Sequence, residues 1–209
     1  MIVVTTATVN SLRGRLQRWE WQSKRRQWVQ QGFSVPVVVG KQGLAWQKQE
    51  GDGRTPIGAF DLGPFFGFDA RLVSLKFSYR QLTNQTECID DPRSHFYNQL
   101  IERPQVIPDW QSSEKMHQTE LYRYGSVIQY NMPATPGQGS CIFMHRWRDN
   151  KHGTAGCIAL SQSHLLSLLR WLSATKTPRV IVFPRSACGV SLPFVPEPIF
   201  SLSCQPSLA

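Results

Sequence analysis

The sequence predicts a mainly β domain, a sandwich or open barrel, with one amphipathic helix. Short apolar stretches punctuated by turn residues run through most of the 209 residues, and hydrophobic residues make up 41% against 18% charged, as in globular chains. Helical spacing is clear at Leu165, Leu168, Leu169 and Leu172. Because this length supplies one core, we expect a single domain over residues 1–184 and a proline- and serine-rich tail at 185–209.

The first half of the chain is expected to consist of strands and turns. Strands are predicted at residues 1–9, about 15–22, 26–30 and 35–39. Gly32 and residues 40–43 are expected to form turns, because glycine clusters there between the apolar runs. Residues 51–67, rich in glycine and proline, fit a turn followed by a short strand.

The second half contains a polar interruption, two core strands and the helix. Residues 84–124 are polar and irregular, and a long insertion of this kind often carries binding surface. Core strands are predicted at 126–130 and 141–145, the helix at 162–173 with Ser161 or Ser163 as its N-cap, and a last strand at 180–183.

The net charge of +9 favours anionic partners. Basic residues surround Trp19 and Trp21, a mixture that also occurs on nucleic-acid-binding faces, but the alternation there is more simply a hairpin with its aromatic side chains on the buried side. We therefore expect no nucleic-acid partner. No apolar run reaches the length of a membrane helix, so membrane insertion is not expected either.

The N-terminal residues 1–9 alternate and then turn polar, which indicates a first strand and not a basic-then-apolar signal segment. On sequence alone this predicts a cytoplasmic protein. If a leader has been removed, the expected place is the periplasm or cell envelope.

Five cysteines occur without the spacing of a zinc site, so no zinc site is expected, and catalysis by a cysteine nucleophile would require no metal or organic cofactor. An odd number leaves at least one thiol free if disulfides form, and Cys157 is the thiol we expect to be free. Cys141 lies in an apolar strand, where a cysteine usually acts as a small buried hydrophobic residue.

Cys157 has the surroundings of a nucleophile. His145 closes an apolar strand, and Cys157 follows twelve residues later, after Thr154, Ala155 and Gly156. A nearby imidazole, a helix N-terminus and free N–H groups in a glycine turn favour a thiolate, and the N–H groups of Gly156 and Cys157 are candidates for an oxyanion hole. The predicted chemistry is acyl transfer through a thioester, with His145 as the base. His152 lies in a polar loop and is expected to be exposed.

Together with the segment Gly51-Asp-Gly-Arg-Thr-Pro-Ile-Gly58, these residues resemble the L,D-transpeptidase catalytic-domain (YkuD-type) family over roughly residues 33–184. The resemblance implies a β-sandwich-like domain and a cysteine enzyme acting on peptidoglycan stem peptides. Cys157 would attack the carbonyl of the third-residue diamino acid, release the terminal D-alanine and pass the acyl group to an amine. His145 would be the general base.

The sequence departs from the common family signature, in which Ser-His-Gly-Cys is followed by an apolar residue and an arginine. Here Ala155 replaces the histidine, Ala159 replaces the arginine, and the loop after His145 is shorter, which indicates a Thr-Ala-Gly-Cys branch. Another guanidinium is then needed for substrate carboxylates, and the candidates beside the motifs are Arg146, Arg148 and Arg54.

Two alternatives remain open. In an L,D-carboxypeptidase or related hydrolase, water would resolve the same thioester. A non-catalytic wall- or nucleic-acid-binding module would apply if Cys157 were inert. The basic charge suits stem peptides, which carry free carboxylates, and the sequence predicts no oligomeric state.

Overall fold

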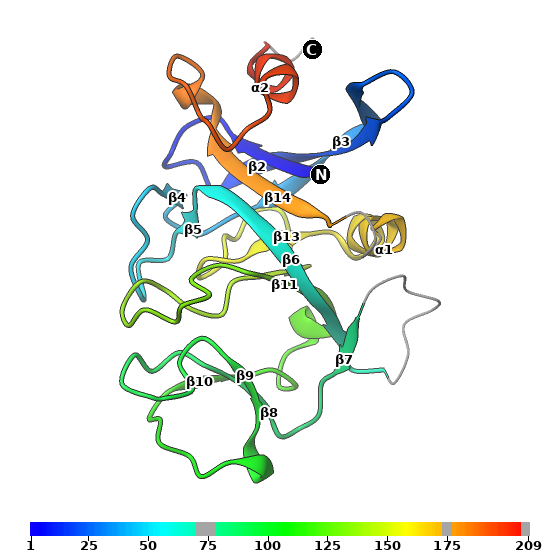
Figure 1. Ribbon diagram of the computed structural model, residues 1–209. Coiled ribbons are helices and arrows are strands. Elements are labelled where there is room, and N and C mark those ends of the chain that lie inside the picture. Colours follow the sequence, from blue (N-terminus) through cyan, green and yellow to red (C-terminus); the bar gives the residue numbers. More distant parts are fainter. Residues whose placement is uncertain (70–77, 173–176, 206–209) are drawn as a thin grey trace.

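The structure, a computed structural model, describes residues 1–69, 78–172 and 177–205. Its body is a nine-stranded mixed sheet in the order β11-β12-β13-β3-β2-β1-β14-β6-β7 (Figure 1). The strands are β1 (Ile2–Thr6), β2 (Arg13–Gln22), β3 (Gln27–Val38), β6 (Gly58–Gly67), β7 (Tyr79–Gln81), β11 (Tyr124–Ile128), β12 (Phe143–Arg146), β13 (Ile158–Leu160) and β14 (Arg179–Pro184). Because β6 also pairs with β11, the first strand of this order, the sheet folds back on itself. The predicted mainly β fold class is confirmed.

The long hairpin of β2 and β3 differs from the expected pattern. Two strands separated by a turn at Gly32 were predicted, whereas β3 runs through this position with Gly32 at φ +69° and a register shift opposite Leu16 and Arg18. A positive φ lets glycine accommodate the extra residue of a bulge, so the strand bends without ending. Trp19 is buried as expected, but Trp21 is 47% exposed and packs edge-to-face on Trp28.

The predicted helix is α1 (Gln162–Trp171), which begins after Ser161. The hydroxyl of Ser161 accepts a hydrogen bond from the His164 N–H, as an N-cap does. Its leucines at 165, 168 and 169 are buried in the main core. The expected last residue of the helix, 173, lies outside the described residues.

The insertion at 84–124 is more regular than the sequence indicates. It contains a second sheet in the order β10-β8-β9, formed by β8 (Thr86–Ile89), β9 (Leu100–Glu102) and β10 (Ser113–Lys115), with short 3-10 turns at Arg103–Gln105 and Glu120–Tyr122. This small sheet lies beside the lower end of the main sheet (Figure 1). A disulfide from Cys88 to Cys141 ties it to the segment before β12, so Cys141 is not the free hydrophobic residue we expected.

The tail is also folded as far as residue 205. A 3-10 turn (Arg185–Ala187) follows β14, and a short second helix, α2 (Glu197–Cys204), buries Ile199 in the main core. The disulfide Cys188–Cys204 closes this segment. Helix α2 is too short for the spacing of its apolar residues to have been recognised in the sequence. Among the described residues, none of the helices has the length and apolar content needed to cross a membrane.

Candidate active site

The alternation of side chains along two neighbouring strands places His145 and Cys157 on the same face of the main sheet. In the parallel pair of β12 and β13, Met144 lies opposite Ile158 and His145 opposite Ala159. Because successive side chains in a strand point to opposite faces, the face with Met144 and Ile158 enters the main core, and the other carries His145 and Cys157. The small Ala159 leaves space beside the imidazole. The strand pairing thus brings together two residues that are twelve positions apart.

The Cys157 thiol is free and almost fully buried, with 5% of the residue exposed. Its Sγ accepts a hydrogen bond from the Phe143 N–H at 3.3 Å and donates to the Cys141 carbonyl at 3.4 Å. Burial, aided by the charge of Glu114, raises the pKa of the thiol. The resting side chain is therefore a neutral thiol and not the thiolate expected from the sequence. The helix N-terminus expected beside it is displaced, because β13 intervenes before α1.

His145 is buried and held by the backbone of the next residue. Its Nδ1 lies 2.7 Å from the Arg146 carbonyl oxygen. Because a carbonyl only accepts hydrogen bonds, Nδ1 carries the hydrogen and Nε2 of the neutral ring is an acceptor. Burial lowers the pKa of His145 to about 4, and Tyr122 packs edge-to-face on the ring at 5.1 Å between centroids. The site rests with a neutral imidazole beside a neutral thiol.

Hydrogen bonds fix the turn before Cys157. The Thr154 hydroxyl donates to the Cys157 carbonyl at 2.6 Å and accepts from the Gly156 N–H at 3.1 Å. The Thr55 hydroxyl donates to the Gly156 carbonyl at 2.7 Å and accepts from the Gly40 N–H at 2.9 Å. Since the Gly156 N–H is already engaged, the structure does not leave it available for an oxyanion, contrary to our expectation. The Cys157 N–H remains the candidate.

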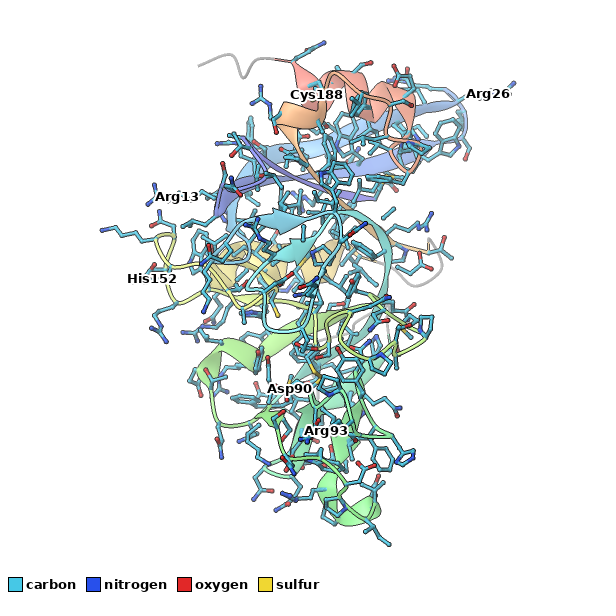
Figure 2. All side chains as sticks on the ribbon, turned by 90° about the vertical axis from the view of Figure 1, so that its left-hand side faces the viewer. Arg13, Arg26, Asp90, Arg93, His152 and Cys188 are labelled. Carbon is cyan, nitrogen blue, oxygen red and sulfur yellow. A yellow bond between two sulfur atoms is a disulfide. The ribbon has the colours of Figure 1, made fainter. Side chains whose placement is uncertain are left out.

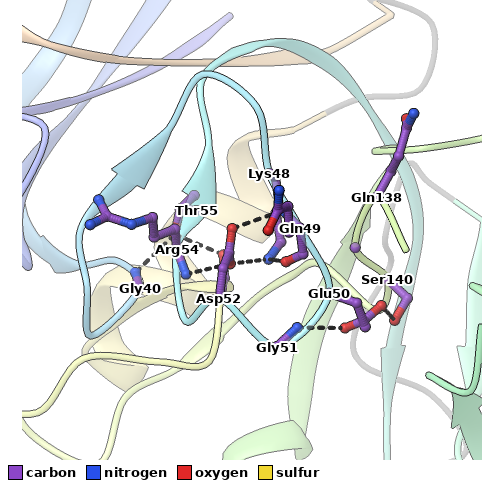
Figure 3. Close-up of polar contacts among 12 residues, drawn as sticks. Gly40, Lys48, Gln49, Glu50, Gly51, Asp52, Arg54, Thr55, Gln138 and Ser140 are labelled. Atoms are coloured by element: carbon purple, nitrogen blue, oxygen red, sulfur yellow. Dashed lines mark hydrogen bonds and ion pairs between the residues drawn. The ribbon is translucent and has the colours of Figure 1, made fainter. Parts of the chain in front are cut away.

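The glycine-rich segment that contributed to the family resemblance acts as a brace for this turn. Asp52 accepts hydrogen bonds from the Lys48 ammonium at 2.7 Å and from the N–H groups of Gln49 and Arg54 at 2.9 Å each (Figure 3). This closed loop precedes Thr55 in the short parallel pair of β4 (Leu44–Ala45) and β5 (Thr55–Pro56). A Cβ atom at Gly156 would lie only 3.0 Å from the Arg54 carbonyl oxygen, so a residue with a side chain would fit only if the brace shifted slightly.

Two cavities meet at Cys157. One, of about 330 Å³, is also lined by His145, Tyr122, Arg148, His152 and Thr154. The other, of about 180 Å³, is also lined by Lys41, Lys48, Glu50, Asp90, Ser140 and Gly156. Glu114, Ala155 and Cys157 line both. A larger cavity of about 480 Å³ lies between the β2–β3 hairpin and α1 and is lined by tryptophans among other residues. It shares no lining residue with the two cavities at Cys157. The thiol is thus bordered by cavities on two sides.

The structure brings one of the three proposed arginines to these cavities. Arg148 lines the larger of the two, and its side chain is exposed. Arg146 contributes its carbonyl to His145, while its guanidinium contacts Gln162. Arg54 lines neither cavity, because its guanidinium donates to the Leu44 carbonyl at 2.9 Å and to Oδ1 of Asn10 at 3.3 Å. The carboxylate-clamp hypothesis is therefore retained for Arg148 alone.

Several residues of the site were missed by sequence reasoning. Glu114 and Tyr122 come from the insertion, and the Tyr122 hydroxyl donates a hydrogen bond to the Glu114 carboxylate. Asp90 lies in the same insertion, in which the sequence indicated only a general binding surface. His152 is exposed as expected, and its ring is bonded to Asp149 at 2.7 Å.

Comparison with protein families gives a match that includes both candidate catalytic residues. The family model of the L,D-transpeptidase catalytic domain (YkuD) matches residues 7–182. The chain belongs to this family. In this L,D-transpeptidase domain the match extends from the end of β1 into β14, and therefore includes the insertion and both motifs. The assignment to a Thr-Ala-Gly-Cys branch stays a prediction.

No curated protein matches the L,D-transpeptidase domain. Among solved structures, it is similar to the helical cell shape determining protein Pgp2 from Campylobacter jejuni, with 15% sequence identity and a TM-score of 0.43. The similarity covers 88% of this chain and 47% of that one, so the chain spans about half the length of that structure.

Proposed function

We propose that this chain is a peptidoglycan L,D-transpeptidase that acts on tetrapeptide stems through a thioester on Cys157. One observation carries the proposal: a free thiol and a neutral imidazole, on the same face of adjacent strands, line one cavity. Membership of the L,D-transpeptidase family supports the substrate class.

In the proposed acylation step, the thiol proton moves to Nε2 of His145 as Sγ attacks the carbonyl carbon of the diamino acid. The Arg146 carbonyl holds Nδ1–H, so the ring is oriented and the developing imidazolium is stabilised. The N–H of Cys157 is the proposed donor to the oxyanion. The C–N bond to D-alanine then breaks, and His145 returns the proton to the leaving amine.

Burial explains why the resting enzyme would not carry an ion pair. The pKa of the thiol is raised and that of His145 is lowered to about 4, so proton transfer before substrate binds is unfavourable. We infer that transfer accompanies attack, when the thiol sulfur forms its new bond and no free thiolate accumulates. Arg148, at the rim of the larger cavity, would bind a carboxylate of the donor stem.

The thioester is resolved in transpeptidation by an amine and in an L,D-carboxypeptidase by water. Both require the same Cys157 and His145, so the nucleophile that enters the second step separates the two functions. The carboxylates that line the smaller cavity favour the amine.

We further propose that the enzyme works in the cell envelope. Four of the five cysteines are paired in two disulfides, and such bonds persist mainly in oxidising compartments. This favours the envelope over the cytoplasmic location predicted from the N-terminal residues.

The test is incubation of the purified protein with a disaccharide-tetrapeptide, followed by mass spectrometry. Transpeptidation gives a cross-linked dimer with loss of one D-alanine, and a carboxypeptidase gives the tripeptide alone. An acyl-enzyme trapped on Cys157, or a carbapenem adduct there, would identify the nucleophile. No product and no adduct would overturn both enzymatic functions.

Variants of Cys157 and His145 test whether the products and the adduct depend on these two residues. Cys157→Ala should abolish product and adduct, and His145→Gln should lower acylation by roughly 100-fold or more, in line with general base catalysis. His95→Gln is the matched control, because His95 is an exposed histidine paired with Asp109 in the insertion. Equal losses for His145→Gln and His95→Gln would contradict the assignment of His145 as base.

A further inference from the structure

The two cavities at Cys157 differ in charge. The larger contains the cationic Arg148, the exposed His152 and one carboxylate, Glu114, which it shares with the smaller cavity. The smaller contains three carboxylates, Glu50, Asp90 and Glu114, against Lys41 and Lys48, and Lys48 is already paired with Asp52 at 2.7 Å. The thiol therefore borders one cavity in which Arg148 balances Glu114 and a second cavity in which carboxylates predominate. In Figure 2, Asp90 lies in the insertion, on the side nearer the main sheet.

Glu114 is the ionisable residue that borders both cavities together with Cys157. It is held in place, since the Tyr122 hydroxyl donates to one of its oxygens and Tyr122 packs on His145. Burial raises the pKa of Glu114, and the negative charges of Asp90 and Glu50 add to this, while the Tyr122 hydrogen bond opposes it. A carboxylate with a raised pKa takes a proton from an ammonium more readily than an ordinary glutamate does.

A second observation concerns Asp90, another residue that lines the smaller cavity. Oδ1 of Asp90 is buried and accepts no hydrogen bond from any residue that the structure describes. Buried carboxylate oxygens are normally paired, because leaving one unpaired is costly. An ammonium has three N–H donors and a positive charge, which suits two neighbouring carboxylates.

We propose that Glu114, with Asp90, forms the binding site for the acceptor ammonium and determines that an amine, and not water, resolves the thioester. This inference rests on the proposed function. In the proposed step, the acceptor ammonium gives one proton to the Glu114 carboxylate and becomes a neutral amine. The amine attacks the thioester carbonyl, the C–S bond breaks, and the second amine proton passes to His145. Its transfer to the departing thiolate restores the thiol, and Glu114 releases its proton to water.

The charges separate the two substrates. Carboxylates of the donor stem fit the larger cavity, which contains Arg148, and the ammonium of the acceptor's diamino acid fits the smaller cavity, where Asp90 and Glu50 join Glu114. The donor carries a similar side-chain ammonium, and the experiment therefore has to distinguish donor from acceptor.

The test measures how the acyl-enzyme is partitioned. With Glu114→Gln, which keeps the shape and a hydrogen-bond acceptor for Tyr122, the ratio of cross-linked to hydrolysed product should fall by roughly 10-fold or more, the worth of a hydrogen bond to a charged group. The KM for the acceptor should rise, and Asp90→Asn should act in the same direction. The matched control is Asp61→Asn. It removes an exposed carboxylate on β6 that is paired with Arg179 of β14.

Hydroxylamine, which is uncharged at neutral pH, provides the second measurement. Its transfer needs no ammonium site, so the Glu114→Gln acyl-enzyme should react with it at the wild-type rate. Equal loss toward hydroxylamine and the diamino acid would overturn the proposal in favour of a general structural role. A rise in donor KM with unchanged partition would assign the ammonium to the donor and also overturn it. If wild-type protein forms no acyl-enzyme, it is the proposed function that fails, whereas wild-type cross-linking matched by Glu114→Gln would refute the Glu114 site alone.

Discussion

At the scale of single residues, burial decides the protonation of the site. The sequence suggested Cys157 and His145 as a candidate pair from their positions around a strand and a glycine turn. It did not show that both side chains would be nearly inaccessible and that both would rest neutral. Burial removes the water that would solvate a thiolate, whereas a neutral thiol needs little solvation. The same burial that shields a thioester from water therefore also disfavours the thiolate.

The lowered pKa of His145 predicts a pH-dependent loss of stability. The unfolded chain protonates this histidine near its ordinary pKa of 6.5, whereas the folded protein keeps it neutral down to about 4. Between these values the unfolded state binds more protons, so acidification favours unfolding, by up to about 3 kcal/mol once the pH is below 4. Denaturant titrations from pH 7 to pH 4 would measure this. His145→Gln should have a shallower pH dependence over the window, and an identical slope in both proteins would refute the assignment.

Two substitutions of Thr55 separate the effect of side-chain shape from the effect of its hydrogen bonds. Thr55→Val keeps the side-chain shape but leaves the Gly156 carbonyl and the Gly40 N–H without the hydroxyl. We expect a loss of about 1–3 kcal/mol in unfolding free energy. Acylation should slow by roughly 10- to 100-fold, because a displaced nucleophile reacts poorly. Rates of carbapenem adduct formation would measure it. Thr55→Ser keeps the hydroxyl and should stay close to wild type; similar defects in both variants would contradict the role of this hydrogen bond.

At the scale of elements, the small sheet β10-β8-β9 completes a site that the main sheet begins. Strand β12 provides His145, and Cys157 directly precedes β13, while the insertion adds Glu114 and Tyr122. The connection is covalent, since the Cys88–Cys141 disulfide ends at the residue whose carbonyl accepts the thiol hydrogen bond. The second disulfide, Cys188–Cys204, closes the α2 segment, and neither of its cysteines lines a cavity at Cys157.

The two disulfides predict different consequences of their removal. The first joins residues 53 apart and the second residues 16 apart, for which loop-closure entropy gives about 4 and about 3 kcal/mol. Replacing Cys88 and Cys141 by serine should lower both unfolding free energy and acylation rate. Replacing Cys188 and Cys204 should lower stability and leave acylation within about twofold, a change too small to reflect lost transition-state contacts. Denaturant titration and adduct kinetics would measure these effects, and comparable acylation losses in both variants would contradict this division.

At the scale of the whole molecule, the net charge of +9 gives the protein a long-range attraction for anionic polymers. Murein stems carry free carboxylates, so the field would concentrate the enzyme on its proposed substrate. The local acidic group at the smaller cavity opposes this field at one side of the thiol. The molecule would then attract the polymer as a whole while selecting an ammonium at one point.

This charge predicts salt-sensitive binding to insoluble murein. Raising the salt from about 0.1 M to about 1 M shortens the Debye length from roughly 10 to roughly 3 Å, so sedimentation with sacculi should weaken several-fold. The rate of carbapenem adduct formation on Cys157 at both salt concentrations serves as the control. If that rate fell as much as the binding to sacculi, salt would have altered the protein itself and not only screened its attraction to murein. Binding that is unaffected by salt would show that the net charge plays no part.

Local chemistry in the sequence determined the mainly β class and the helix after Ser161, and it predicted the Cys157/His145 pair. Side-chain alternation, helical spacing and a glycine turn act between residues near one another in the chain. The bulge at Gly32, the folded insertion and the α2 segment depended on pairing between distant residues. Tertiary structure alone decided that Thr55 supports Gly156, that Arg54 turns away, and that Glu114 reaches Cys157. The physical reason is that hydrogen bonding and desolvation at a site depend on which segments meet in space, and the polar insertion contains no local pattern that specifies where it will pack.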